Sequence, residues 1–206
     1  SQVPAADLDC LIEPRVVVSV APAVEGVIET VTVDRGDFVA AGAVIATLES
    51  SLERAAVASA RYRTQMEAAL KSNQIRLEYG DRRVVRTEQA YNEGGLALRE
   101  LDEAETAKLL AEIGVLEARE NTRLAELELA RASEALALRS IRSPVSGVVM
   151  QRFLSPGEFT KQAPIVKLAQ IDPLNVEVIV PVALYGSFAV GRVAEGSRLS
   201  EEVDAA

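Results

Sequence analysis

Side chains that commonly carry out chemistry are few in this sequence, and none of them forms a recognisable catalytic set. There is no histidine, which removes the most frequent general base and the most frequent metal ligand. The single cysteine, Cys10, has no partner for an intrachain disulfide, and it follows Asp9 rather than the small residue expected before a lipid attachment site. Asp34 and Asp37 flank a glycine in a turn sequence, where acidic side chains ordinarily have a structural role. We therefore expect no enzymatic activity, no catalytic residues and no cofactor.

Metal binding and nucleic-acid binding are disfavoured on the same grounds. The two methionines, Met66 and Met150, lie far apart in the sequence, so the soft ligands that copper or silver would require are not grouped. No glycine-rich phosphate-binding loop is present. The net charge is −9, whereas phosphate backbones are bound by clustered Lys and Arg. We expect no metal site and no nucleic-acid partner.

A repeated β pattern is the most informative feature of the chain. Residues 24–38 read VEGVIETVTVDRGDF and residues 145–159 read VSGVVMQRFLSPGEF, and the two align without a gap. Each copy predicts short strands separated by turns, with β-branched residues in the strands and glycine in the turns. One copy alone would expose an apolar face, but two copies can bury these faces against each other as a small sandwich. We interpret four glycines as structural turn positions of this sandwich: Gly26, Gly36, Gly147 and Gly157.

The segment between the two copies has a different character. Residues 51–139 contain no proline, and Ala, Glu, Arg and Leu dominate them. Spacings of three and four residues define a heptad seam in the second half, apolar at nine of eleven positions. Its positions are Leu101, Ala104, Lys108, Ala111, Val115, Ala118, Thr122, Ala125, Leu129, Ala132 and Leu136. The pattern predicts an antiparallel helical hairpin with its tip near residues 92–97 and arms of about 60 Å. In the first arm we expect an interruption at Gly80, since glycine disfavours a helix interior.

The split β pattern resembles the biotinyl/lipoyl carrier fold. In carriers the two halves are joined by a tight turn that bears the modified lysine. Here the long insert takes the place of that turn, and the nearest lysines are Lys71 and Lys161. A carrier function is therefore the weaker alternative.

The interrupted arrangement resembles HlyD-like membrane fusion proteins, the periplasmic adaptor subunits of tripartite RND- or ABC-type efflux pumps. Three motifs carry this resemblance: Ala21-Pro22 with Gly26, Arg142-Ser143-Pro144 with Gly147, and Gly157-Glu158. After them, residues 172–180 alternate like a strand and resemble the opening of the family's β-barrel domain.

The resemblance implies an α+β fold, in which a lipoyl-like β-sandwich is split by a long antiparallel coiled-coil hairpin and followed by the start of a β-barrel domain. It divides the chain into a flexible N-terminal tail (1–14), two halves of a lipoyl-like domain (15–50 and 140–171), the hairpin (51–139), and a partial β-barrel with a C-terminal tail (172–206).

The implied function is a periplasmic adaptor that links an inner-membrane transporter to an outer-membrane channel of the TolC type. The cargo would be small organic compounds or drugs. The adaptor would form a homo-oligomer, a hexamer or a trimer of dimers, and the full-length protein would be associated with the inner membrane. A self-assembling coiled-coil scaffold is the further alternative.

The resemblance also implies a docking tip. Many adaptors carry the pattern Arg-x3-Leu-x6-Ser there, and in this chain Arg86 holds the first position while Ala90 and Ala97 replace the Leu and the Ser. Glu100 could complete a capping box, but the hydroxyl that would cap the helix is missing. The full set of expected docking residues is Arg82, Arg83, Arg86, Ala90, Leu96, Ala97, Glu100 and Leu101.

Overall fold

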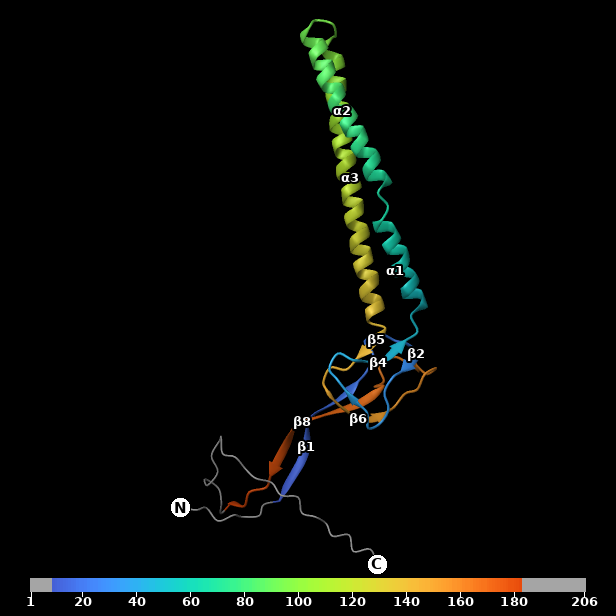
Figure 1. Cartoon of the computed structure of the whole chain (residues 1–206), viewed down its shortest axis with the longest axis vertical. Coiled ribbons are helices and arrows are strands. Elements are labelled where there is room, and N and C mark those ends of the chain that lie inside the picture. The colour runs from blue at the N-terminus through green and yellow to red at the C-terminus, as the bar shows by residue number, and fades with distance from the viewer. Residues whose placement is uncertain (1–8, 183–206) are drawn as a thin grey trace, which may run out of the picture.

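The structure is a computed structural model, and it describes residues 9–182. A helical hairpin rises from a small β module, and a two-stranded ribbon leaves the module on the other side (Figure 1). In chain order the elements are β1 (Cys10–Val20), β2 (Gly26–Val31), β3 (Phe38–Val39), β4 (Val44–Leu48), α1 (Ser51–Thr64), α2 (Ala68–Asn92), α3 (Leu98–Ala137), β5 (Ser140–Arg142), β6 (Gly147–Arg152), β7 (Phe159–Thr160) and β8 (Val166–Val178). Within the described residues, no helix combines the length and the apolar character needed to cross a bilayer.

The β module consists of two four-stranded sheets, and each sheet takes strands from both copies of the sequence repeat. Their strand orders are β1-β8-β6-β3 and β5-β4-β2-β7. The copies also exchange turn contacts. The N–H of Gly36 donates to the carbonyl of Val149 at 2.9 Å, and the N–H of Gly157 donates to the carbonyl of Ile28 at 2.8 Å. Neither copy can therefore complete its backbone hydrogen bonds without the other.

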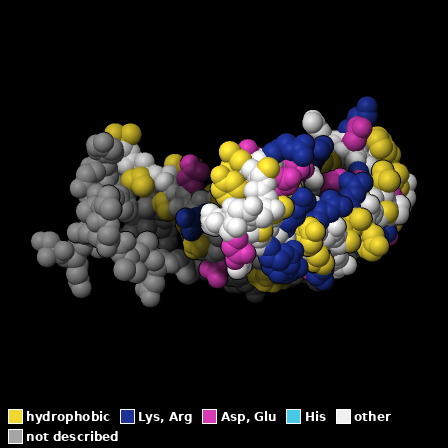
Figure 2. Space-filling model, turned by 90° about the horizontal axis from the view of Figure 1, so that it is seen from above, with side chains coloured by type: hydrophobic (Ala, Val, Ile, Leu, Met, Phe, Trp, Pro, Cys, Tyr) yellow, Lys and Arg dark blue, Asp and Glu magenta, His cyan; other side chains and the backbone are white. Residues whose placement is uncertain are grey.

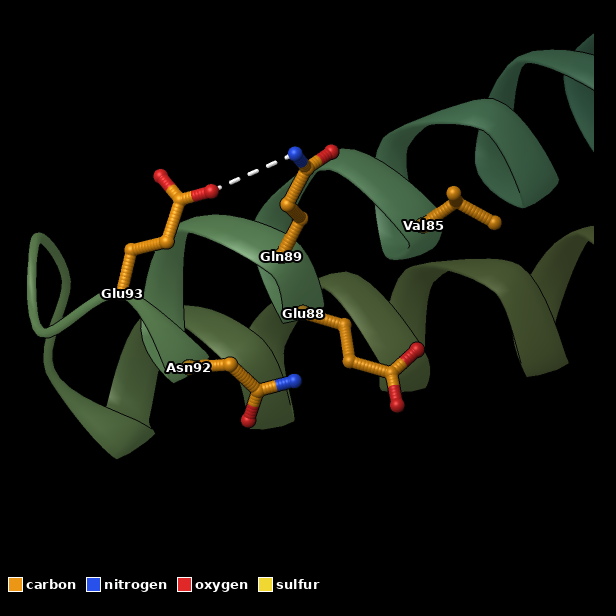
Figure 3. A pocket seen from close by; sticks show the side chains of 5 residues that line it. All are labelled: Val85, Glu88, Gln89, Asn92 and Glu93. Carbon is orange, nitrogen blue, oxygen red and sulfur yellow. Dashed lines mark hydrogen bonds between the residues drawn. The ribbon is translucent and has the colours of Figure 1, made fainter.

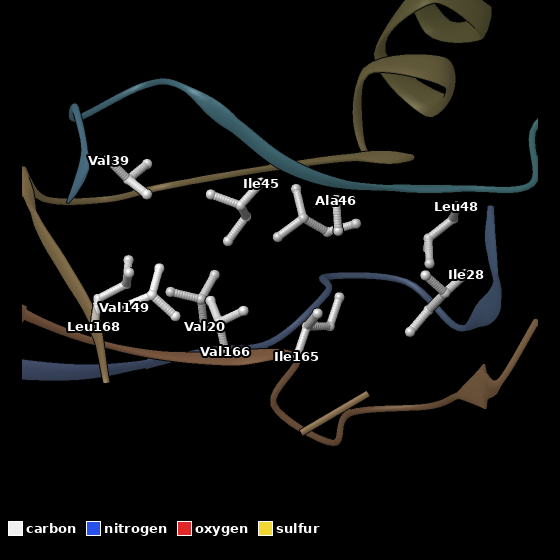
Figure 4. Packing of buried hydrophobic residues seen from close by; sticks show 11 residues of the cluster. Val20, Ile28, Val39, Ile45, Ala46, Leu48, Val149, Ile165, Val166 and Leu168 are labelled. Carbon is white, nitrogen blue, oxygen red and sulfur yellow. The ribbon is translucent and has the colours of Figure 1, made fainter. Parts of the chain in front are cut away.

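The core of the module lies between the two sheets (Figure 4). Repeat-related positions are buried alike: Ile28 and Val149 are each 1% exposed, and Ile45 and Val166 are fully buried. The buried cluster comprises Val20, Ile28, Val39, Ile45, Ala46, Leu48, Ile141, Val149, Ile165, Val166 and Leu168. These side chains are all aliphatic and of moderate size, so they fill a thin sandwich without any of the few aromatic residues of the sequence.

Two of the predicted domain boundaries fall inside strands, one in β1 and one in β8. Residues 10–14 belong to β1 rather than to a tail, and they pair with residues 174–178 of β8. The boundary expected at residue 172 falls inside β8, since this strand runs on to Val178. A β-bulge between Pro14 and Val16 shifts the register but does not end the pairing. Residues 1–8 and 183–206, which complete the two predicted terminal segments, lie outside the described residues.

The glycines expected in turns fall into two groups. Gly36 and Gly157 adopt positive φ angles of 94° and 90°, which favour glycine. Gly26 and Gly147 instead begin strands β2 and β6, so their assignment to turns is wrong. There the lack of a side chain leaves room for a close neighbour: the Arg139 guanidinium at Gly26, and the backbone of Ala169 at Gly147.

The two turns that contain Gly36 and Gly157 are each closed by an acidic side chain. The backbone N–H of Asp34 donates to Asp37 Oδ2 at 2.7 Å. In the second copy the N–H of Ser155 donates to Glu158 Oε2 at the same distance. The pair Asp34 and Asp37 thus has the structural role that its position in a turn sequence indicates.

In the hairpin, α1 and α2 both lie along α3. All eleven seam positions expected from the sequence are buried or half-buried on α3. The first arm, however, is continuous at Gly80 and broken at residues 65–67, between α1 and α2. Gly80 is buried inside α2, where an added β-carbon would lie 3.2 Å from the Cα of Lys108. Its small size permits close contact between the helices, so the expected interruption there is wrong.

Candidate docking site at the hairpin tip

The tip of the hairpin is a tight turn between α2 and α3. Gly94 adopts a φ of 78°, and its N–H donates to the carbonyl of Tyr91 at 2.9 Å. The N–H of Gly95 donates to the carbonyl of Ala90 at 2.9 Å. These two bonds form a Schellman motif, which satisfies the last carbonyls of α2. The turn is therefore rigidly closed on the α2 side.

At the other end of the turn, the first N–H groups of α3 lack a side-chain cap. Ala97 occupies the N-cap position in an extended conformation, and no side chain caps the helix. The N–H of Glu100 donates to the carbonyl of Ala97 at 3.1 Å, in place of a bond to a cap hydroxyl. The Oε2 atom of Glu100 is buried and has no hydrogen-bond partner within the described residues. The first turn of α3 thus has the unfilled cap that the sequence indicates.

The expected docking residues lie in two environments. Five are exposed at or near the tip: Arg82, Arg83, Arg86, Leu96 and Ala97. The other three, Ala90, Glu100 and Leu101, are half-buried between the arms. The structure therefore leaves the three arginines and two residues of the turn accessible to a partner. The half-buried ones support the turn from inside.

The basic side chains near the tip make only weak ionic contacts within the described residues. Arg82 lies 3.9 Å from Glu78 one turn away, and both side chains are well exposed. Such an exposed pair contributes little to stability. Seen from above, the described surface shows basic side chains interspersed with hydrophobic ones (Figure 2). A partner can replace these weak contacts without disturbing the fold.

A surface pocket that the sequence did not single out lies on α2 beside the turn (Figure 3). It has a volume of about 330 Å³ and is lined by Val85, Glu88, Gln89, Asn92 and Glu93. The amide of Gln89 donates to Glu93 at 3.3 Å across its rim. A neighbouring pocket of about 370 Å³ is lined by Asp81, Arg82, Val85 and Arg86.

Val85 borders both pockets and is 63% exposed. A signal for it was present in the sequence, because Val84 and Val85 are adjacent and only one of two neighbours can face the other arm of a hairpin. In the structure Val84 is half-buried and Val85 faces outward. The surface of α2 near the tip thus combines an apolar centre with basic groups on one side and acidic groups on the other.

An ion pair fixes the two arms below the tip. Lys108, a polar residue in the seam, lies 2.9 Å from Asp81 on α2 and 3.9 Å from Glu112. The hydrogen bond with Asp81, together with its charge, raises the pKa of Lys108 above its ordinary value. A polar residue at a coiled-coil seam position helps to select the register of the helices. This pair therefore helps to determine which residues of each arm meet at the tip.

Comparison with known proteins identifies the family. Residues 16–170 match the family model described as the CzcB-like, barrel-sandwich hybrid domain, which is well over half of the chain. The chain belongs to this family. The match confirms the resemblance to membrane fusion proteins inferred from the sequence, and it establishes the fold as a barrel-sandwich hybrid of mixed helix and strand content. No curated protein sequence gives a significant match.

Solved structures of other proteins share the fold, including the following two. The crystal structure of MacA from Actinobacillus actinomycetemcomitans has a TM-score of 0.72 and 19% identity, over 86% of this chain and 58% of that chain. The membrane fusion protein Spr0693 from Streptococcus pneumoniae R6 has a TM-score of 0.50 and 18% identity, over 82% of this chain and 68% of that chain. This barrel-sandwich hybrid chain thus spans somewhat more than half of the length of MacA.

Proposed function

We propose that this chain is the hairpin-bearing part of a periplasmic adaptor, which links an inner-membrane transporter to an outer-membrane channel of the TolC type. The observation that carries the proposal is the geometry of the hairpin. Helix α3 has 40 residues, so the tip stands about 60 Å from the β module at 1.5 Å per residue. Such an arm suits a protein that spans a distance between two partners.

The tip supports the proposed contact with a channel. Its exposed groups include three arginines, Leu96 and Ala97, and Val85 adds an apolar centre on α2. Arginine and exposed apolar side chains are typical anchors of protein interfaces. We propose that Arg86 meets acidic groups of the channel while the turn contacts its apolar surface.

A second apolar stripe on α3 supports self-association. It lies on the side of the helix turned away from the seam, and each of its members is more than half exposed. The stripe consists of Leu109, Ile113, Leu116, Leu124 and Leu127. Large apolar side chains grouped on one exposed helix face suit an interaction site. We propose that neighbouring copies cover it in a hexamer or a trimer of dimers.

The remaining parts of the proposal follow from the family. The β1–β8 ribbon at residues 172–178 would lead into a β-barrel domain that faces the transporter. The full-length protein would reside in the periplasm in association with the inner membrane. It would be non-catalytic, without a cofactor, and would serve the export of small organic compounds or drugs.

Site-specific crosslinking in cells tests the proposal. A photoreactive amino acid at Ala97 of the intact protein is compared with one at Ala130, which is also exposed on α3 but lies about 50 Å further along it. We expect an adduct with an outer-membrane channel from Ala97 only, and Arg86→Glu should weaken it. An adduct with the protein itself alone, or none from either position, would refute the adaptor function and favour a self-assembling scaffold.

A further inference from the structure

A cluster of polar contacts lies where the hairpin joins the β module. The linkers are short on both sides: β4 ends at Leu48 and α1 begins at Ser51, whereas α3 ends at Ala137 and β5 begins at Ser140. The backbone N–H of Leu48 donates to the carbonyl of Arg139 at 2.8 Å, which ties the two linkers together. The direction of the hairpin is therefore set within a few residues.

Arg139 reaches three parts of this junction. Its Nη2 atom lies 2.6 Å from Glu53 Oε1 in the first turn of α1. Its Nη1 atom donates to the backbone carbonyl of Glu25, just before β2, at 3.0 Å. The residue itself follows the end of α3. One guanidinium thus connects both arms of the hairpin to the β module.

The surroundings of Arg139 distinguish this contact from the other ion pairs of the described residues. The side chains of Arg139 and Glu53 are 23% and 15% exposed, whereas those of the mid-arm pair Arg63 and Glu128 are 55% and 52% exposed. Gly26 provides the space for the guanidinium, since a β-carbon there would lie 2.8 Å from Arg139 Nη1. A shielded guanidinium that donates to two separate groups, the Glu53 carboxylate and the Glu25 carbonyl, holds its geometry better than an exposed pair does.

We propose that Arg139 is a positioning residue that holds the hairpin in one direction relative to the β module. Tilting the hairpin would separate the guanidinium from Glu53, from the Glu25 carbonyl, or from both. The lever is long: with 40 residues in α3, a tilt of about 10° moves the tip by about 10 Å. Small adjustments at this junction therefore decide where the tip points. The inference concerns direction alone, and it stands whether or not the tip docks on a channel.

Distances between spin labels test the proposal directly. One label is placed at the tip, at Ala97→Cys, in a protein in which Cys10 is replaced by serine. The second is placed on the module, at Arg35→Cys or at Pro156→Cys in separate samples. These two positions are exposed and repeat-related, so they view the tip from different points of the module.

Three variants release the contact in different ways: Arg139→Ala removes the guanidinium, Glu53→Ala removes its partner, and Gly26→Ala displaces the guanidinium with a β-carbon. We expect each to shift or broaden the distance distribution by several ångströms while the helix content by circular dichroism stays unchanged. Arg63→Ala is the matched control, since it breaks an arginine–glutamate pair far from the junction.

The expected result is the same change in all three junction variants and none in Arg63→Ala. If Arg139→Ala fails to fold, Gly26→Ala and Glu53→Ala decide the question, since both keep the arginine. Distributions in these variants that match those of Arg63→Ala would overturn the proposal. Because this experiment involves no channel, its outcome is separate from that of the crosslinking experiment.

Discussion

Replacing Gly147 with alanine is expected to destabilise the β module more than the same replacement at Gly26, although the two glycines occupy equivalent positions of the repeat. A β-carbon at Gly147 would collide with the carbonyl oxygen of Ala169 and lie 2.8 Å from its carbonyl carbon. These are backbone atoms of β8, which pairs with β6 at this point. They can move only if the two strands separate. At Gly26 the nearest atom belongs to the flexible end of Arg139.

The difference should amount to about 1–2 kcal/mol. Forcing extra atoms into a well-packed site costs about 1–3 kcal/mol when backbone has to shift, and a total stability of about 5–15 kcal/mol makes such a loss easy to detect. Gly26→Ala should cost less than about 1 kcal/mol, because a guanidinium can turn aside. The free-energy cost of Gly157→Ala should lie between the costs of these two replacements. This position has open space around the β-carbon, but its φ of 90° costs about 1–2 kcal/mol for a residue with a side chain.

Urea unfolding followed by NMR is the appropriate assay. Circular dichroism would report mainly on the hairpin, so the backbone amide signals of the core residues Val20 and Val166 are monitored instead. The expected order of unfolding midpoints is Gly26→Ala above Gly157→Ala, with Gly147→Ala lowest. Equal midpoints for Gly147→Ala and Gly26→Ala would refute the argument that the backbone contact with Ala169 requires glycine.

Three further predictions concern the core, the tip and the seam. Leu48→Ala removes a fully buried side chain and should lower the free energy of unfolding by about 2–5 kcal/mol in calorimetry; a loss below 1 kcal/mol would contradict its place in the core. Ala97→Ser supplies a cap acceptor for the N–H of Glu100, so hydrogen exchange there should slow about five-fold, equivalent to about 1 kcal/mol; an unchanged rate would count against the open cap. The pKa of Lys108 is raised mainly by its hydrogen bond with Asp81. This contact therefore stabilises the folded protein fully below the ordinary pKa of lysine. Its contribution is lost as the pH rises through the raised pKa. Asp81→Asn should therefore reduce the alkaline fall in melting temperature, and an equal fall in both proteins would show that the pair is unimportant.

The hairpin seam could be predicted from the sequence because a local rule determines it. Alanine recurs at seam spacing and allows close approach of a second helix, and every expected position proves at least half-buried. Hydrophobicity alone would have predicted that a different face of α3 contacts the first arm. The exposed stripe that includes Leu109, Ile113 and Leu116 is richer in large apolar side chains than the seam. The seam is recognisable in the sequence because its spacing continues over ten intervals, whereas the exposed stripe is interrupted by charged residues.

The break between α1 and α2 could not be predicted in the same way. No glycine or proline marks residues 65–67, so no local signal ends the helix there. The reason lies in the contact with α3. The inward residues of α1 include Val57 and Thr64, and those of α2 include Leu70 and Leu77. From Thr64 an unbroken heptad would place Lys71 inward, yet the structure places Leu70 there. The break shifts the register by one residue and keeps the lysine in solvent, which is a tertiary effect.

Gly26 and Gly147 show most clearly what a sequence repeat does and does not determine. The repeat correctly predicts that both copies build equivalent strands, since Ile28 and Val149 are buried alike. It also suggests one shared reason for both glycines, and this is where the inference fails. One faces the base of the hairpin and the other faces β8, because the hairpin is inserted at only one of the two related places. A repeat preserves the backbone pattern, but the neighbours of each copy depend on what is attached to it. The junction around Arg139 lies at the copy to which the hairpin is attached, where the guanidinium is the nearest neighbour of Gly26.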